Sequence, residues 1–172
     1  LMKKGEAFIS EPRIAYVDST FFKVFSFPVL QGNPSVALND PNTCVVSESA
    51  AVKYFGSTDA VGKLMERDDK TSFKVTAVMK DMPVNSHFRF DVLLSMDNVE
   101  YSFGNYLSHN FHTYLLLRDK AGLESIKKAI PSYIQKYVLP QVKVFTGIKS
   151  IEDFEKAGNS LSYTIMPLTD IH

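Results

Sequence analysis

Three of the four histidines lie in polar segments where an imidazole could bind a metal or act as a general base. His109 and His112 are three residues apart in SHNFH, and His87 lies upstream beside Ser86. On a strand or loop this spacing does not reliably point two rings toward one ion, and neighbouring Ser and His rarely act as nucleophile and base. We therefore interpret His87 as a corner residue hydrogen-bonded to backbone, and we predict no catalytic residue and no metal site.

The other candidates for chemistry are better explained by structure. Cys44 is the single cysteine and lies in the apolar segment TCVVS, so we interpret it as a buried small hydrophobe rather than a nucleophile. One cysteine excludes an internal disulfide and a cysteine-based zinc site. The chain has neither a G-x-x-x-x-G-K-[ST] phosphate loop nor a G-x-G-x-x-G fingerprint, which predicts that it binds no nucleotide and no cofactor.

Composition indicates a folded globular domain. The 172 residues are 45% hydrophobic and 22% charged, and 19 basic residues balance 19 acidic ones. Nucleic-acid binding normally needs an excess of Lys and Arg, so we exclude that class of partner. No apolar run approaches the roughly 18–20 residues of a membrane helix. Because the chain opens on Leu1 and stops at His172, we expect it to be a piece of a longer protein.

Alternating strand and helix signals predict the elements that position these residues. A strand is expected over residues 13–18, followed by a helical turn over residues 20–25. The turn would place Phe21, Phe22 and Phe25 on one side. Aromatic residues at this spacing are more typical of a core than of a ligand pocket, which stays open as the alternative.

A capped helix is the clearest local prediction. After a turn at residues 31–34, a short buried strand leads to Ser47, whose hydroxyl can cap the N-terminus of a helix. Gly56 is placed to end that helix in the left-handed conformation. The residues expected to pack inward are Ala51, Tyr54 and Phe55.

Two strands are predicted around the polar turn ERDDKTS, and another after the break DMPVNS. Apolar and polar residues alternate in the two strands that follow the turn and the break. Residues 85–88 are expected to form a rigid polar corner before the second strand. The side chains expected to share one face are Phe73, Val75, Ala77 and Met79 in the first strand, and Phe88, Phe90, Val92 and Leu94 in the second.

The last third of the chain is predicted to contain a strand at residues 111–119, a helix at residues 122–139 and a strand at residues 161–167. Pro131 lacks a backbone N–H, so we expect it to kink or divide the helix. The apolar stripe of the helix consists of Leu123, Ile126, Ile130, Ile134 and Val138. The complete pattern is that of a mixed α+β domain.

Four segments follow one another along the chain: VDSTFFKVFSFPVLQGNP, VVSESAAVKYFGSTDAVGK, FKVTAVMKDMPVNSHFRFDVLLSM and the terminal MPLTDIH. Together they resemble the large extracytoplasmic domain of MacB-type, FtsX-like ABC transporter permeases. The family has a strand leading into an aromatic turn, a helix closing in FG, a G-K step and a Pro-Asn-Ser-His corner. The matching positions are Phe21, Phe22, Phe25, Gly32, Ala50, Tyr54, Phe55, Gly56, Gly62, Lys63, Pro83, Asn85, Ser86, His87, Phe88 and Asp91.

The resemblance implies a two-subdomain MacB-like periplasmic core with fold class α+β. A porter-like strand-helix-strand part would comprise about residues 1–30 and 111–172, and a sabre-like insertion would comprise about residues 31–110. Both would form one extracytoplasmic domain fragment, residues 1–172, on the periplasmic face of the bacterial inner membrane. The full-length protein would be a multi-pass membrane protein.

The resemblance also implies function and partners. The domain would belong to an export or mechanotransmission permease, would move with a cytoplasmic ABC ATPase, and would contact cargo or an envelope protein. A second permease copy would be a partner in the full-length protein. The alternatives are an extracytoplasmic sensory or ligand-binding module, which would need an enclosed pocket with convergent polar groups, and a hydrolase built on one of the histidines.

Overall fold

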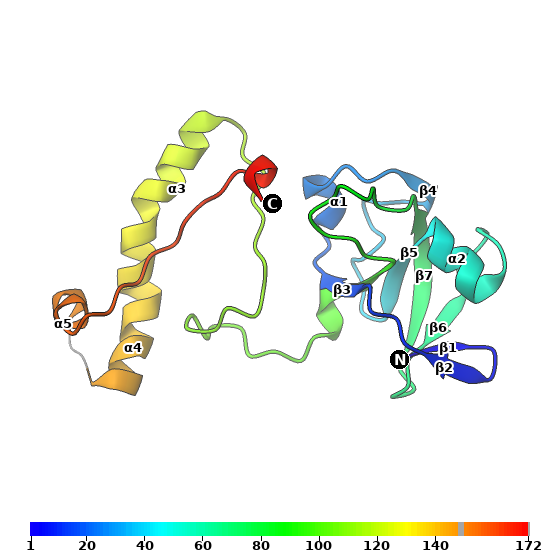
Figure 1. Cartoon of the computed structure of the whole chain (residues 1–172), viewed down its shortest axis with the longest axis horizontal. Helices are drawn as coiled ribbons and strands as arrows, with labels where there is room; N and C mark the ends of the chain where they lie inside the picture. Colours follow the sequence, from blue (N-terminus) through cyan, green and yellow to red (C-terminus); the bar gives the residue numbers. More distant parts are fainter. Residues whose placement is uncertain (148–149, 172) are drawn as a thin grey trace. The chain divides into compact units, whose positions relative to one another are not determined.

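The structure is a computed structural model that describes residues 1–147 and 150–171. Contacts between residues divide the chain into two units, Leu1–Glu100 and Tyr101–His172 (Figure 1). The first unit contains a mixed β-sheet with short helices, and the second is helical. The fold is therefore α+β, as predicted.

A six-stranded sheet forms the framework of the first unit. The strands follow the order β3-β8-β5-β7-β4, and β6 also pairs with β7. Pairing is parallel between β3 and β8 and between β5 and β7, and antiparallel between the other neighbours. The strands are β3 (Ile14–Val17), β4 (Val29–Gly32), β5 (Thr43–Ser47), β6 (Leu64–Glu66), β7 (Ser72–Met79) and β8 (Val92–Ser95).

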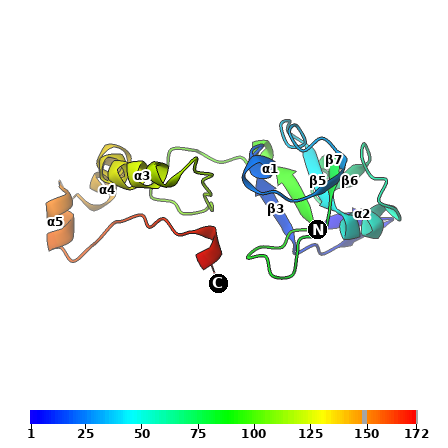
Figure 2. The ribbon, with the colours of Figure 1, turned by 90° about the horizontal axis from the view of Figure 1, so that it is seen from above.

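Hydrophobic clusters cover both faces of this sheet. Cys44 and Val46 of β5 belong to the first cluster and Val45 to the second, and successive strand residues point to opposite faces. Helix α2 (Glu48–Phe55) packs on the first cluster and α1 (Phe21–Val24) on the second. Figure 2 shows the two helices on opposite sides of the sheet.

The four side chains of β7 that were predicted to share one face do not do so, because the strand contains a β-bulge. Cys44 pairs with Val75 but the next residue, Val45, pairs with Ala77, so Thr76 is an extra residue in the ladder. The bulge reverses the alternation. Phe73 and Val75 therefore pack in the first cluster, whereas Ala77 and Met79 pack in the second.

Strand β8 is shorter than predicted. The prediction that Phe88, Phe90, Val92 and Leu94 share one face is wrong for a similar reason. The amides of Asp91 and Val92 both donate to the carbonyl of Arg13, at 2.8 and 3.2 Å. Two successive amides on one acceptor interrupt the alternation of a regular strand. Phe88 and Phe90 consequently pack in the second cluster, whereas Val92 and Leu94 of β8 pack in the first.

A hairpin that the sequence did not suggest precedes the sheet. Its strands, β1 (Met2–Lys4) and β2 (Ala7–Ile9), pair antiparallel, and Met2 forms a bridge with Arg67 next to β6. Met2 is fully buried in the first cluster.

The turn expected at residues 31–34 begins later than predicted, because Gln31 and Gly32 belong to β4.

The second unit is built on one helical segment. It runs through α3 (Lys120–Tyr133), the π-helical η2 (Ile134–Val138) and α4 (Leu139–Thr146). Ile134 and Val138 are buried, as the predicted stripe requires. The other elements of the second unit are α5 (Ile151–Lys156) and the short η3 (Leu168–Asp170), while the short η1 (Met96–Asn98) ends the sheet region of the first unit.

Pro131 lies inside α3 and does not divide it. The predicted break is replaced by the π-helical turn that begins at Ile134, whose amide donates to the carbonyls of Ile130 and Pro131. A π-turn accommodates the locally altered hydrogen-bond pattern without ending the helix. The helix therefore continues past the proline.

The strands predicted at residues 111–119 and 161–167 are not strands in the described structure. A strand needs a neighbour to receive its backbone hydrogen bonds, and none of the described elements of this unit is a strand. Leu161 and Tyr163 of the second segment instead pack on the cluster of Ile134, Val138 and Val142.

The sheet joins strands from both of the sequence ranges expected to form separate subdomains. β3 lies within residues 1–30 and β4 begins there, yet they pair with β8 and β7 from residues 31–110. The contact boundary accordingly falls after Glu100. The assignment of porter-like and sabre-like parts stays a prediction.

Within the described residues, no helix combines the length and apolarity needed to cross a membrane.

Candidate functional site

Aromatic side chains from two of the resemblance segments meet on the second cluster. The ring of Phe21 lies 5.1 Å from that of Phe25 and 6.1 Å from that of Phe88. Phe25 and Phe88 meet edge to face at 5.1 Å. Phe22 packs against Phe21 at 5.2 Å. This arrangement supports the core interpretation of the phenylalanines, because Phe21 is buried and the others pack around it.

The polar corner at Pro83–Phe88 is a turn that carries part of this aromatic cluster. The amide of Ser86 donates to the carbonyl of Pro83 at 3.0 Å, and Asn85 lies exposed in the turn. His87 places its ring 4.1 Å from Phe88. His109 lies in the other unit, where its ring is 6.4 Å from that of Tyr163. Among the residues that the structure describes, no three potential metal ligands gather.

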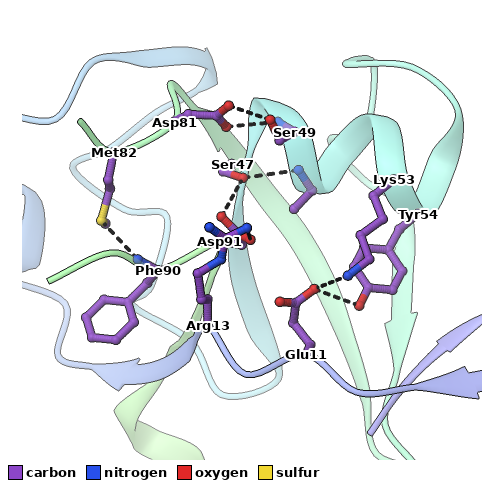
Figure 3. Close-up of polar contacts among 11 residues, drawn as sticks. Glu11, Arg13, Ser47, Ser49, Lys53, Tyr54, Asp81, Met82, Phe90 and Asp91 are labelled. Carbon is purple, nitrogen blue, oxygen red and sulfur yellow. Dashed lines mark hydrogen bonds and ion pairs between the residues drawn. The ribbon is translucent and has the colours of Figure 1, made fainter. Parts of the chain in front are cut away.

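Ser47 caps α2 as the sequence predicts. Its Oγ accepts a hydrogen bond from the amide of Ala50 at 3.1 Å and reaches Asp91 Oδ1 at 3.5 Å. Its own amide donates to the carbonyl of Asp91 at 2.7 Å. A single buried serine therefore joins β5, α2 and the residue before β8 (Figure 3).

Two carboxylates surround this helix terminus. The carboxylate of Asp81 accepts a hydrogen bond from the amide of Ser49 at 2.9 Å and another from the Ser49 hydroxyl. Asp91 pairs with Arg13 at 2.5 Å. Burial raises the pKa of Asp81, but the hydrogen bonds from Ser49 and Ser47 and the charge of Arg13 outweigh it and hold the pKa below its usual value.

A second ionic contact ties α2 to the segment before β3. Glu11 accepts hydrogen bonds from Lys53 Nζ at 2.6 Å and from the Tyr54 hydroxyl at 3.1 Å, and its side chain is only 2% exposed. Burial raises the pKa of Glu11, yet Lys53 and Tyr54 together lower it below the usual value. Burial and the Glu11 charge both raise the pKa of Tyr54.

The FG and G-K pairs of the family resemblance are Phe55–Gly56 and Gly62–Lys63. They lie at the end of α2 and in the loop that follows it. Gly56 has a φ of 76° and its amide donates to the carbonyl of Val52, so the helix ends in the predicted left-handed cap. Gly62 donates to the carbonyl of Val75 at 2.7 Å. Lys63 places its Nζ 5.4 Å from the ring centre of Phe55.

Gly32 fills a role that the sequence pattern alone did not reveal. It has a φ of 87°, and a Cβ at this position would lie 2.3 Å from the carbonyl oxygen of Thr76. Gly32 therefore allows β4 to approach the bulge of β7. The Thr76 hydroxyl donates to the carbonyls of Ala37 and Cys44, at 2.5 and 2.9 Å, which satisfies the acceptors beside the bulge.

Cys44 is completely buried in β5. Burial raises the pKa of its thiol to about 12, so the thiolate is scarce at neutral pH. This agrees with its interpretation as a small hydrophobe.

A pocket of about 190 Å³ opens beside the capped terminus of α2. Its walls combine charged and apolar side chains from three separate stretches of sequence, and Asp91 is the only one of them among the resemblance positions. Composition and periodicity could not find the rest, because residues so distant in sequence converge only through the β3-β8-β5 pairing. The pocket walls include Arg13, Ser49, Asp81, Met82, Arg89 and Phe90.

The described contacts at this site are structural. Each carboxylate of the pocket is held by protein donors, and neither Ser47 nor Ser49 is paired with a histidine base in the described contacts. The contacts connect α2, β5, Asp81 and Asp91 with one another.

Comparison with known proteins identifies the family. The profile of the MacB-like periplasmic core domain matches residues 3–133. The chain belongs to this family. The family is described as the periplasmic core domain of MacB-like proteins. No curated protein matches the sequence.

One solved structure supports the fold assignment. A domain of a permease protein from Porphyromonas gingivalis is 24% identical with a TM-score of 0.61, and the alignment covers 79% of this chain and 64% of that chain. The chain therefore spans less than two thirds of that relative. The periplasmic region of MacB from Actinobacillus actinomycetemcomitans is 13% identical, with a TM-score of 0.44 and coverage of 94% and 72%. The extracellular domain of the transporter YknZ from Gram-positive bacteria is 18% identical, with a TM-score of 0.38 and coverage of 49% and 43%.

Proposed function

We propose that this domain transmits motion between a cytoplasmic ATPase and the outer side of the membrane. In this proposal the chain is the extracytoplasmic domain of an ABC-type permease, and its two units move as bodies when ATP drives the membrane helices. The domain meets cargo or an envelope protein on the periplasmic side. A second permease copy completes the transporter.

The observation that carries this proposal is the family match, which begins in the sheet unit and extends to the end of α3. The internal contacts of residues 1–100 support it further. Ser47, Asp91 and Arg13 join β5, the residue before β8 and the segment before β3. The Glu11 contacts with Lys53 and Tyr54 join that same segment to α2. A unit held together in this way can move as one body in a hinge or shear change.

Spin labels in the two units test the proposal in the full-length permease with its ATPase in lipid nanodiscs. Val84→Cys in the sheet unit and Val144→Cys in the helical unit offer side chains that are 81% and 82% exposed. Cys44 can stay, because its buried thiol does not label readily. We expect ATP to change the distance distribution between the labels, because the units move relative to each other.

A label pair within the sheet unit provides the control. Leu64→Cys is 64% exposed, and with Val84→Cys it reports only internal motion of that unit. We expect this distribution to be unchanged by ATP. Identical distributions between the units with and without ATP, in a permease with active ATPase, would sink the proposal of coupled motion.

A further inference from the structure

One cationic side chain of the pocket beside α2 has no polar partner among the described residues. Arg89 lines the pocket, and among the described residues its side chain takes part in no hydrogen bond or ion pair. Arg13, the other guanidinium of the pocket, is paired with Asp91 at 2.5 Å. Arg89 is therefore free to bind an anion.

The acidic side chains of the pocket do not compete for this guanidinium. Ser49 donates to Asp81 through both its amide and its hydroxyl. Asp91 is held by Arg13 and by the Ser47 hydroxyl. Each carboxylate thus has hydrogen-bond donors of its own, whereas none of the described contacts engages the Arg89 guanidinium.

The pocket also has an apolar side. Met82 is 6% exposed and Phe90 is half-buried, and both line it. Its volume of about 190 Å³ is smaller than the roughly 300–1,000 Å³ of pockets that hold drug-sized ligands. Its size and composition suit a single charged group that is followed by an apolar side chain.

We propose that this pocket binds the carboxylate of an acidic peptide segment, with Arg89 as the residue that recognises it. A guanidinium presents two parallel N–H donors that match the two oxygens of a carboxylate. A phosphate dianion fits less well, because it would bring two negative charges beside Asp81 and Asp91 against one free cation. The neighbouring apolar residue of the peptide contacts Met82 and Phe90.

This inference rests on the proposed function only for the source of the peptide, which would be an envelope partner or a polypeptide cargo. The pocket lies within residues 1–100, and its test needs neither the membrane nor the ATPase. Failure of the spin-label experiment therefore leaves the peptide site untouched, and failure of the peptide experiment leaves the coupled motion untouched.

Calorimetric and NMR titration of the whole 172-residue chain provides the test, with three peptides at low ionic strength. Acetyl-Ala-Glu-Leu-amide carries a side-chain carboxylate, acetyl-Ala-Gln-Leu with a free C-terminus carries an α-carboxylate, and acetyl-Ala-Gln-Leu-amide is neutral. Inorganic phosphate is the fourth probe. We expect at least one carboxylate peptide to bind and to shift the amides of Arg89 and Phe90, and which one binds distinguishes the two carboxylate sources.

Two variants assign the interaction. Arg89→Gln should weaken binding about tenfold or more, as expected for the loss of a charged bidentate contact. Lys80→Gln is the matched control, because it removes the same charge from an exposed residue that does not line the pocket, and it should change affinity less than about threefold. If Arg89→Gln does not fold, Arg89→Lys keeps the charge without the fork and should still weaken binding measurably.

Several outcomes would overturn the proposal. These are equal binding of the neutral peptide, equal affinity in Arg89→Gln and the unsubstituted protein, binding of phosphate but not of the carboxylates, and no binding of any probe at millimolar concentration. A carboxylate peptide that binds through Arg89 and is insensitive to Lys80→Gln supports it.

Discussion

Gly32 lies at the point where β4 passes the bulge of β7. It combines a positive φ with a close approach to Thr76, whereas Gly56 has a positive φ and no atom near its would-be Cβ. Comparing the two glycines distinguishes backbone strain from steric contact. A side chain at either position would meet an unfavourable φ, but only at Gly32 would it also clash with neighbouring atoms.

We predict that Gly32→Ala lowers the free energy of unfolding by about 2–4 kcal/mol, since strain at positive φ and overpacking add. Gly56→Ala should cost only about 1 kcal/mol, from the φ alone. Urea denaturation followed by circular dichroism measures both. Equal losses for the two variants would contradict the close approach of β4 to the bulge.

Glu11 is a buried carboxylate held by Lys53 and Tyr54, and its pKa is lowered in the folded state. A lowered pKa means that its stabilising contribution is present above the unfolded-state pKa of Glu and is lost as pH falls through the folded-state value. Because burial opposes the shift, the hydrogen bonds with Lys53 and Tyr54 are what keep the carboxylate ionised.

We predict that Glu11→Gln lowers the free energy of unfolding by about 1–2 kcal/mol at pH 7, because it weakens charged hydrogen bonds to a buried group. The difference from the unsubstituted protein should shrink as pH falls below about 4.5. Denaturation at a series of pH values measures it. Glu6→Gln, at an exposed position in the hairpin turn, should be neutral throughout, and a pH-independent loss for Glu11→Gln would refute the ionic explanation.

At the scale of elements, α2 is the helix that the described contacts anchor most firmly in the sheet unit. Its N-cap Ser47 is completely buried and also contacts Asp91. Ser150 caps α5 with the same hydrogen-bond pattern, accepting from Asp153 at 3.0 Å, but α5 is short and mostly exposed. The two caps allow one interaction to be compared in two environments.

We predict that Ser47→Ala costs about 1–2 kcal/mol of unfolding free energy, whereas Ser150→Ala costs about 0.5–1 kcal/mol or less. The buried site loses both the cap and the contact with Asp91, and water cannot replace either. Chemical denaturation of the two variants checks this. A larger loss at Ser150 than at Ser47 would show that α2 does not depend on its cap.

At the scale of the molecule, the two units differ in how much apolar surface they bury. Both faces of the sheet carry a cluster of buried side chains, including Val45, Phe73 and Leu93. The described core of the helical unit consists of Ile134, Val138 and Val142 with partly buried neighbours. Since burial of apolar area dominates folding free energy, the sheet unit should be the more stable one.

We predict that amides in β5 and β7 exchange with solvent only on global unfolding, whereas amides in α3 exchange through local opening. Native-state hydrogen exchange followed by NMR measures both. Amides of α2 serve as the control, because they belong to a helix that lies on the larger core. Protection in α3 as high as in β5 would mean that the two units unfold together.

Local signals in the sequence were sufficient for the elements that depend on neighbours along the chain. Ser47 and Gly56 mark the two ends of α2, because a cap and a left-handed glycine act within a few residues. The apolar spacing of Ile134 and Val138 likewise predicts which side of the long helix is buried. The order of the aromatic turn, the FG helix and the Ser-His corner was enough to predict the family.

Other features were decided by the tertiary structure. The bulge at Thr76 arises from the pairing of β7 with β5, and it reverses a face that period-two alternation had predicted. The segments at residues 111–119 and 161–167 have strand-like sequences, but strands form only where a partner accepts their hydrogen bonds. The pocket of Arg13, Asp81 and Arg89 exists because long-range pairing brings distant residues together, and no local pattern records that.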